Sequence, residues 1–252
     1  MEPLDANPTR RFSDRAEDYA RYRPSYPAAA IDAILAGLAP PSQLVVADVG
    51  AGTGISARLL ADRGARVVAV EPNAAMRTAA LAHPRVTWVD GTAECSNLAA
   101  NAHDVVLAAQ AFHWFDVPKA LGEFRRILRP QGRLAIVWNK RSREEAFTLG
   151  YRMALEAIDG EAPAERSTFD PAVVTATGLF ANLRQQVFRN AHALTEDELI
   201  GRAMSTSTVP REGPRTDELL RLLHALHARH RGADGRATMV YGTEVYLWDR
   251  RD

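Results

Sequence analysis

The sequence contains one cysteine, almost no lysine and no long apolar run. Its single cysteine, Cys95, excludes an internal disulfide and is typical of a protein from a reducing compartment. No apolar stretch approaches the roughly 20 residues that are needed to cross a bilayer, and the N-terminal residues lack the apolar core of a signal peptide. We therefore expect a cytoplasmic protein with no membrane partner.

An excess of charge of either sign is also missing. The 31 basic and 31 acidic residues balance, and only Lys119 and Lys140 among the basic residues are lysines. A neutral chain generates no overall field that attracts nucleic acid or an anionic membrane, so we expect neither as a partner. For the state of assembly we expect a monomer or a homodimer.

What the chain does contain is a regular alternation of apolar strands and helical patterns. Of its 252 residues, 46% are hydrophobic and 25% are charged, which are ordinary globular values. This alternation predicts an α/β fold with a parallel, doubly wound sheet. The expected strands are residues 44–49, 66–70, 86–90, 104–109, 133–139, 183–189 and 239–248. The expected helices are residues 12–23, 27–38, 55–62, 72–82, 117–128, 143–158, 196–204 and 215–231, with a turn at 129–132 and a loop at 160–171.

We expect residues 1–252 to form one domain, because neither a repeat nor a long linker divides the chain. Within it, residues 10–40 are expected to form N-terminal lid helices and residues 41–141 a nucleoside-binding core. Residues 142–238 are expected to form a cap with further core elements, and residues 239–252 the closing strand.

A glycine turn follows the first strand. The strand ends at Asp48-Val49, and Gly50, Gly52 and Gly54 come next, directly before a helix that starts at Ile55. Glycine provides conformational freedom and lets a backbone approach a ligand closely. The following strand ends on Glu71, about twenty residues later, where an acid can accept both ribose hydroxyls. This pattern of strand, glycine turn, helix, strand and acid predicts a nucleoside-binding site.

The spacing of the glycines bears on which nucleoside is bound. A dinucleotide fingerprint has the pattern GxGxxG and presents a helix N-terminus to a pyrophosphate. Here the glycines alternate, and Asp48 precedes them. A carboxylate at this position repels a pyrophosphate but attracts the ammonium group of a methionine moiety. The pattern therefore favours S-adenosylmethionine (SAM) over NAD.

Several polar and aromatic residues follow other strands of the predicted sheet. Ligands of such sheets bind outside the carboxyl ends of the strands. This rule brings residues 91–94, 110–116 and 139–141 to the same edge as Asp48 and Glu71.

The sequence resembles the class I SAM-dependent methyltransferases of the type 11 group, in particular the trans-aconitate-methyltransferase-like branch. The resemblance is carried by residues 22–27 (YRPSYP), 48–54 (DVGAGTG), 71–73 (EPN), 91–94 (GTAE), 109–116 (AQAFHWFD) and 128–134 (LRPQGRL). It covers roughly residues 12–141, and the remainder only by architecture. It implies a Rossmann-like methyltransferase fold, with a mostly parallel seven-stranded sheet, an antiparallel last strand and a helical lid or cap.

The resemblance also implies an enzyme that transfers a methyl group from SAM to a small-molecule acceptor. It assigns Asp48 and Gly50 to the methionine end, Glu71 to the ribose, and Thr92 and Ala93 to the adenine. Many members have Asp in place of Thr92, so this contact would depend on a hydroxyl and on the Ala93 amide. The full set of expected cofactor-binding residues is Asp48, Gly50, Gly52, Glu71, Pro72, Met76, Thr92, Ala93 and Gln110.

The acceptor is expected to be a carboxylate or a hydroxyl, although the sequence identifies neither. His113 is the candidate base or orienting residue, because its unperturbed pKa lies near operating pH. A carboxylate needs no base and favours pairing with an arginine. The expected substrate-binding residues are Tyr22, Arg23, Trp114, Phe115 and Arg141, and Arg143 is a further candidate arginine.

The sequence also allows a metal site and two other functions to be considered. His224, His227 and His230 step three residues apart on one predicted helix, and we expect no metal there because no nearby acid completes a cluster. A nicotinamide-dependent oxidoreductase is the alternative enzyme, and the glycine spacing disfavours it. A protein that binds SAM without catalysis is the third alternative.

Overall fold

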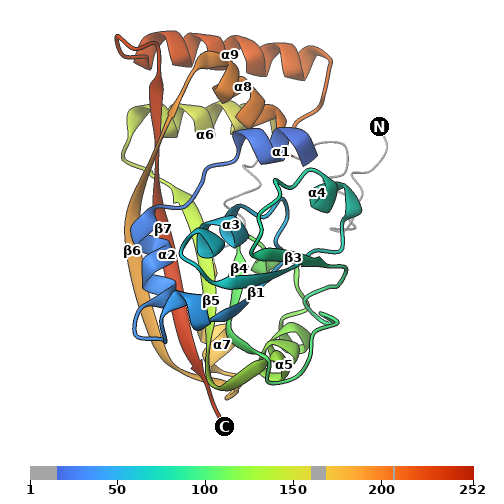
Figure 1. The fold of residues 1–252 in the computed structure, drawn as a ribbon. Helices are drawn as coiled ribbons and strands as arrows, with labels where there is room; N and C mark the ends of the chain where they lie inside the picture. Colours follow the sequence, from blue (N-terminus) through green and yellow to red (C-terminus); the bar gives the residue numbers. More distant parts are fainter. Residues whose placement is uncertain (1–15, 160–168, 207) are drawn as a thin grey trace. The chain divides into compact units, whose positions relative to one another are not determined.

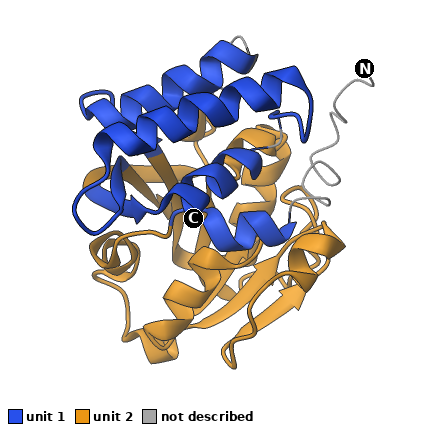
Figure 2. Cartoon of the chain, turned by 90° about the horizontal axis from the view of Figure 1, so that it is seen from above, with its two compact units in different colours: residues 1–24, 140–168, 189–242 blue, residues 25–139, 169–188, 243–252 orange. Residues whose placement is uncertain are grey.

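A computed structural model describes residues 16–159, 169–206 and 208–252 (Figure 1). It divides into two compact units, which Figure 2 shows in different colours. Unit 1 combines residues 1–24, 140–168 and 189–242, and unit 2 combines residues 25–139, 169–188 and 243–252. The start of the first expected helix (residues 12–15) and most of the expected loop (residues 160–168) lie outside the described residues.

In the described part of the chain, seven strands form one sheet in the order β3–β2–β1–β4–β5–β7–β6. Strand β1 pairs in parallel with β2 and β4, and the pairs β2–β3 and β4–β5 are also parallel. This confirms the mostly parallel, seven-stranded sheet that was expected. The strands are β1 (Val45–Val49), β2 (Arg66–Val70), β3 (Val86–Val89), β4 (His103–Ala109), β5 (Leu128–Arg141), β6 (Phe180–Leu194) and β7 (Ala237–Arg250).

The last strand, β7, runs antiparallel to β5. The backbone N–H of Ser142, just after β5, donates to the Val240 carbonyl, whereas at the start of β5 the Leu128 carbonyl accepts from the Arg250 side chain. Residue numbers in the two strands therefore run in opposite directions, which confirms the expected antiparallel closing strand. The backbone N–H of Arg251 likewise donates to Leu179, directly before β6.

Unit 2 has an apolar core on each face of its sheet. Consecutive residues of a strand point to opposite faces. Accordingly, Val105 packs in one core with α2 and α3, while Val106 packs in the other with α5 and α7. Two short 3₁₀ turns, η2 (Pro41–Gln43) and η3 (Phe112–Trp114), also belong to this unit. Its helices are α2 (Ala28–Leu35), α3 (Ile55–Asp62), α4 (Ala74–Thr78), α5 (Val117–Ile127) and α7 (Ala172–Thr175).

Unit 1 has a third apolar core, formed mainly by helices. Its helices are α1 (Ala16–Tyr22), α6 (Ala146–Asp159), α8 (Glu196–Met204) and α9 (Pro214–His230). Tyr151 of α6, Leu199 of α8 and Leu223 of α9 are fully buried in this core. Helix α8 begins with a capping box in which Thr195 and Glu198 satisfy each other's backbone N–H, as the sequence favours. The expected lid segment 10–40 is divided, because α1 belongs to unit 1 and α2 to unit 2.

Several elements differ from their expected bounds: β6 is longer than the strand expected over 183–189, α7 was not expected, and two further differences have a physical reason. The helix expected over 72–82 is only α4, which begins after the Asn73 cap and ends at Thr78. Beyond it the side chain of Leu81 is 67% exposed, so an added turn would gain little apolar packing. The turn expected at 129–132 lies inside β5. The register between β4 and β5 shifts there, from His103 opposite Leu128 to Val105 opposite Arg133, and Gln131 adopts φ 62°. Pairing with β4 therefore incorporates the Pro-Gly segment as a bulge.

Candidate functional site

The glycine turn joins β1 to α3. Gly50, Gly52 and Gly54 all adopt left-handed backbone conformations, with φ of 70°, 58° and 75°. The N–H groups of Gly50 and Ala51 both donate to the Val70 carbonyl, at 2.9 and 3.1 Å, which fixes the turn to the end of β2. Left-handed conformations at three alternating positions explain why the sequence places glycine at each of them.

Glu71 holds the glycine turn from the adjacent strand end. Its Oε2 atom accepts the N–H of Gly52 at 2.9 Å, and its Oε1 atom accepts the N–H of Asn73 at 2.9 Å. Burial raises the pKa of the Glu71 carboxyl above its ordinary value, and the two backbone N–H donors partly offset this effect. Each oxygen keeps a second lone pair, so this fixed carboxylate can still accept hydroxyl donors. The sequence pattern gave no sign that Glu71 also supports the turn.

Asp48 is a fully buried acid directly before the turn. Its Oδ2 atom accepts the Ser56 hydroxyl at 2.6 Å. Burial raises the pKa of the Asp48 carboxyl to about 7, and the nearby charge of Glu71 acts in the same direction. Its Oδ1 atom has no hydrogen-bond partner among the described residues. A buried acceptor without a donor is costly, so this atom fits a ligand that brings a positively charged donor.

The loop after β3 contains Thr92 and Ala93. The Thr92 hydroxyl accepts the backbone N–H of Cys95 at 3.1 Å, and the Thr92 N–H donates to the Cys95 carbonyl at 3.0 Å. Thr92 thus closes its own turn, and its hydroxyl hydrogen can still be donated. Ala93 is buried, and so is Met76 on α4, whose helix is capped by the Asn73 side chain. Pro72 is half-buried beside Glu71.

The segment after β4, residues 110–116, begins with a strained residue. Gln110 adopts φ 56°, which is unusual for a residue other than glycine, and its side chain donates to the Asn139 carbonyl at 3.3 Å. Strain of this kind is concentrated at functional sites. The sequence predicted a role for Gln110, but it gave no indication of this conformation.

Three aromatic side chains of this segment have different surroundings. His113 is exposed, and its ring centroid lies 4.5 Å from that of Trp114 and 5.3 Å from that of Trp138. Phe115 instead packs edge-on against Phe124 in the core, at 6.0 Å. The sequence did not identify Trp138, whose buried Nε1 atom has no partner within the described ranges.

The remaining expected substrate residues belong to unit 1. The Tyr22 ring packs against Gly201 of α8, where a Cβ atom would lie 2.4 Å from it. Arg23 donates to the Ser205 carbonyl at 3.1 Å, and the Arg141 guanidinium lies 5.1 Å from the Tyr151 ring centroid. The structure therefore places the expected cofactor residues, His113, Trp114 and Phe115 in unit 2, and Tyr22, Arg23 and Arg141 in unit 1.

The three histidines of α9 have separate surroundings. His224 pairs with Glu196 at 2.8 Å, the buried His227 contacts the Leu194 carbonyl at 3.1 Å, and the His230 ring lies 5.8 Å from that of Phe147. Across residues 16–159, 169–206 and 208–252, no group of three or more potential ligand residues is arranged to hold a metal ion. In the same ranges, no helix has the length and apolarity needed to cross a membrane.

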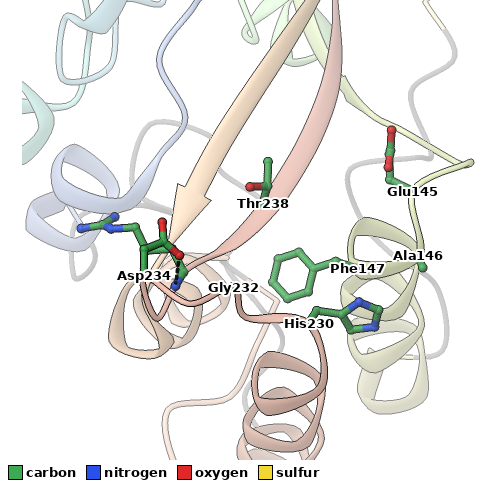
Figure 3. Close-up of a pocket in the computed structure, with 8 residues that line it drawn as sticks. Glu145, Ala146, Phe147, His230, Gly232, Asp234 and Thr238 are labelled. Carbon is green, nitrogen blue, oxygen red and sulfur yellow. Dashed lines mark hydrogen bonds between the residues drawn. The ribbon is translucent and has the colours of Figure 1, made fainter.

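A surface hollow of about 420 Å³ lies in unit 1 (Figure 3). Two of its polar side chains are already engaged: Asp234 accepts the backbone N–H of Arg236 at 3.1 Å, and the Arg236 side chain pairs with Glu198 at 3.0 Å. None of the expected site residues lines it, and we assign it no chemistry. It is lined by Glu145, Ala146, Phe147, His230, Gly232, Asp234, Arg236 and Thr238.

Comparison with known proteins places this chain in a family. The family model of a methyltransferase domain matches residues 47–136, from β1 into β5. An uncharacterized methyltransferase of Mycobacterium tuberculosis is 40% identical over 168 residues, which cover 65% of this chain and 66% of that protein. An uncharacterized methyltransferase-like protein of Schizosaccharomyces pombe is 30% identical over 75% of this chain and 74% of its own length. A solved structure described as a type II methyltransferase from Anaeromyxobacter dehalogenans has a TM-score of 0.66 at 25% identity, covering 91% of this chain and 98% of that chain.

Proposed function

Because the chain belongs to the class I SAM-dependent methyltransferases, we propose that it transfers a methyl group from SAM to an oxygen of a small-molecule acceptor, a carboxylate or a hydroxyl. The observation that carries the cofactor assignment is the pair of buried acids beside the glycine turn. Asp48 has an unpartnered oxygen for a cationic donor, and Glu71 has a fixed carboxylate for a diol. This chemistry fits SAM better than a pyrophosphate cofactor, which two adjacent carboxylates would repel.

The residues of unit 2 have distinct roles in this proposal. Asp48 binds the ammonium group, Glu71 binds the ribose hydroxyls, and the loop at Thr92 and Ala93 meets the adenine. The cofactor supplies a methyl group on a positively charged sulfur, which is already activated for in-line displacement. The task of the protein is then to hold the acceptor oxygen in line, at roughly 3–3.5 Å, and to exclude water.

His113 has a role that depends on the acceptor. If the acceptor is a hydroxyl, the exposed His113 imidazole takes its proton as the bond to oxygen forms. If it is a carboxylate, no proton has to be removed, and His113 with Trp114 orients the acceptor. The ring contacts with Trp114 and Trp138 hold the imidazole in place in either case.

A transfer screen tests the proposal. Radiolabelled methyl transfer from SAM is measured over panels of carboxylic acids, phenols and amines, and we expect label in an acid or a phenol. With a hydroxyl acceptor, His113→Ala is expected to lower the rate by roughly 10²–10⁴ at unchanged SAM affinity, and with a carboxylate by less than about tenfold. His224→Ala, which changes an exposed histidine of α9, serves as the control. Label found only in amines, or in no acceptor despite tight SAM binding, would contradict the proposed reaction.

SAM binding is expected to depend on pH through Asp48. The raised pKa, about 7, means that this carboxyl is protonated below that pH, whereas an ammonium ligand requires the ionised form. The pKa of Asp48 is higher in the folded protein than its ordinary value of 3.8, so the protonated carboxyl stabilises the fold at low pH. This contribution is lost as the pH rises towards about 7. By calorimetry, we expect SAM affinity to be at least about tenfold lower at about pH 5.5 than at about pH 7. Asp48→Asn should flatten this profile, and because Glu71 is retained, the difference between the profiles isolates Asp48. Parallel profiles would show that Asp48 does not meet the cation.

A further inference from the structure

Three arginines of unit 1 come from separate elements. Arg23 directly follows α1, Arg141 ends β5, and Arg202 lies in the last turn of α8. The sequence pointed to Arg23 and Arg141 but not to Arg202, because an arginine in the last turn of a helix is ordinarily explained by the helix dipole. In the structure Arg202 is only 3% exposed, so it does not have the exposed position that such an arginine usually occupies. We call Arg23, Arg141 and Arg202 the arginine cluster.

Much of the hydrogen-bonding capacity of the arginine cluster is unused, although Arg202 shares a side-chain hydrogen bond with Tyr241. Arg23 donates once, to the Ser205 carbonyl, and its guanidinium lies 4.5 Å from the Tyr19 ring centroid. The buried Nε atoms of all three arginines, and Nη1 of Arg202, have no hydrogen-bond partner in the part of the chain that the structure describes. The hydroxyl of the fully buried Tyr151, on whose ring Arg141 lies, is also without a partner there.

No acidic residue among those described pairs with the arginine cluster. Other arginines of the same unit have carboxylate partners: Arg152 pairs with Glu156, Arg221 with Glu218 and Arg236 with Glu198. Burying a cation without a counter-charge costs several kcal/mol as an order of magnitude. Arg202 is buried in this way, and Arg23 and Arg141 are half-buried, so the chain has a local free-energy cost here that a bound anion would offset.

The positive charges of Arg202 and Arg141 both act on the Arg23 guanidinium. Burial lowers the pKa of Arg23 to about 10, and the positive charge of Arg202 is the next largest cause. Arg141 lowers the same pKa to a smaller extent. Tyr151 raises the pKa of both Arg23 and Arg202, and the Arg141 guanidinium lies on its ring. All three arginines of the cluster therefore interact with Tyr151.

We propose that the arginine cluster and the Tyr151 hydroxyl bind a ligand oxyanion that carries two or more negative charges, either a dicarboxylate or a phosphate ester. The planar, forked guanidinium matches the paired oxygens of both groups. Three cations require more than one negative charge for neutrality, which disfavours a simple monocarboxylate. The assignment of this anion to the methyl acceptor rests on the proposed function, whereas the binding of the anion does not.

Thermal unfolding of the full chain, without SAM, tests the site. The melting temperature is followed by scanning fluorimetry against sodium succinate, sodium phosphate and sodium acetate, each compared with NaCl at the same ionic strength. A ligand that binds only the folded state raises the melting temperature in a saturable way. We expect this rise with succinate or with phosphate and a smaller one with acetate. Saturation by succinate alone identifies a carboxylate ligand, and saturation by phosphate alone a phosphate ester.

Two variants and a matched control complete the test. Arg202→Met and the less buried Arg141→Met are each expected to raise the half-saturating anion concentration by at least about tenfold. Arg221→Met, which changes an exposed arginine of α9, should leave it unchanged. The melting temperature of Arg202→Met without ligand should stay close to that of the wild type, because no ion pair is lost and the lost hydrogen bond to Tyr241 is offset by the removal of a buried charge. A wild type that responds like its NaCl control, or anion responses that are unchanged in both variants, would overturn the proposal.

Discussion

Replacing Glu71 with alanine is expected to weaken SAM binding by about 1.5–3 kcal/mol, roughly 10- to 150-fold in affinity. Two losses combine in this variant. The ribose hydroxyls lose a charged acceptor, and the N–H groups of Gly52 and Asn73 lose the oxygens that fix the turn. Calorimetric titration with SAM measures the effect directly.

The Glu71 variant has two matched controls. Glu71→Gln keeps one acceptor oxygen but loses the charge, so its affinity should lie between those of the wild type and the alanine variant. Asp90→Ala removes an exposed acid that follows the next strand and pairs with Arg77, and SAM affinity should change less than about twofold. An affinity that is the same in Glu71→Ala as in the wild type would show that this acid is not at the ribose.

Gly50→Ala is expected to destabilise the protein by about 2–4 kcal/mol and to impair SAM binding. The backbone at Gly50 is left-handed, and a Cβ atom there would lie 2.7 Å from the Cβ of Ala111 and 3.2 Å from the Phe115 ring. Ala111 directly follows the strained Gln110, so the added methyl group should displace residues 110–116 as well as the turn. Urea unfolding and calorimetry measure the two effects.

Gly37→Ala separates backbone strain from steric overlap. Gly37 has a similar φ, 76°, but no atom lies within 4 Å of a Cβ built on it. This variant should therefore lose only about 1–2 kcal/mol of stability and keep its SAM affinity. If the two alanine variants proved equally stable, the contact between the turn and Ala111 would have no energetic importance.

The sequence predicted the part of the fold that depends on local pattern. The apolar strand before Asp48, the alternating glycines and the acid at the end of the next strand all lie within residues 44–71. Their hydrogen bonds join neighbouring strand ends, so strand order and parallel pairing were enough to bring Gly52 and Glu71 together. The ligand-binding roles of these residues, and the trans-aconitate-methyltransferase-like branch, stay predictions.

Other features depend on tertiary contacts that no local pattern reveals. The bulge in β5 forms because β4 pairs on both sides of the segment that contains Pro130 and Gly132. Arg202 has the sequence context of a surface residue on a helix end, and only the packing of α8 in unit 1 buries it. The unusual backbone of Gln110 likewise follows from its place between β4 and the Asn139 carbonyl.

The loop that closes on Thr92 also has a practical consequence for spectroscopy. Cys95 is the only cysteine of the chain, its side chain is exposed, and its backbone N–H and carbonyl are both hydrogen-bonded to Thr92. A thiol-reactive fluorophore therefore attaches at one known position of the unmodified sequence, in the turn expected to meet the adenine. The natural chain thus has a built-in attachment point for a dye that reports on this turn while cofactor is titrated.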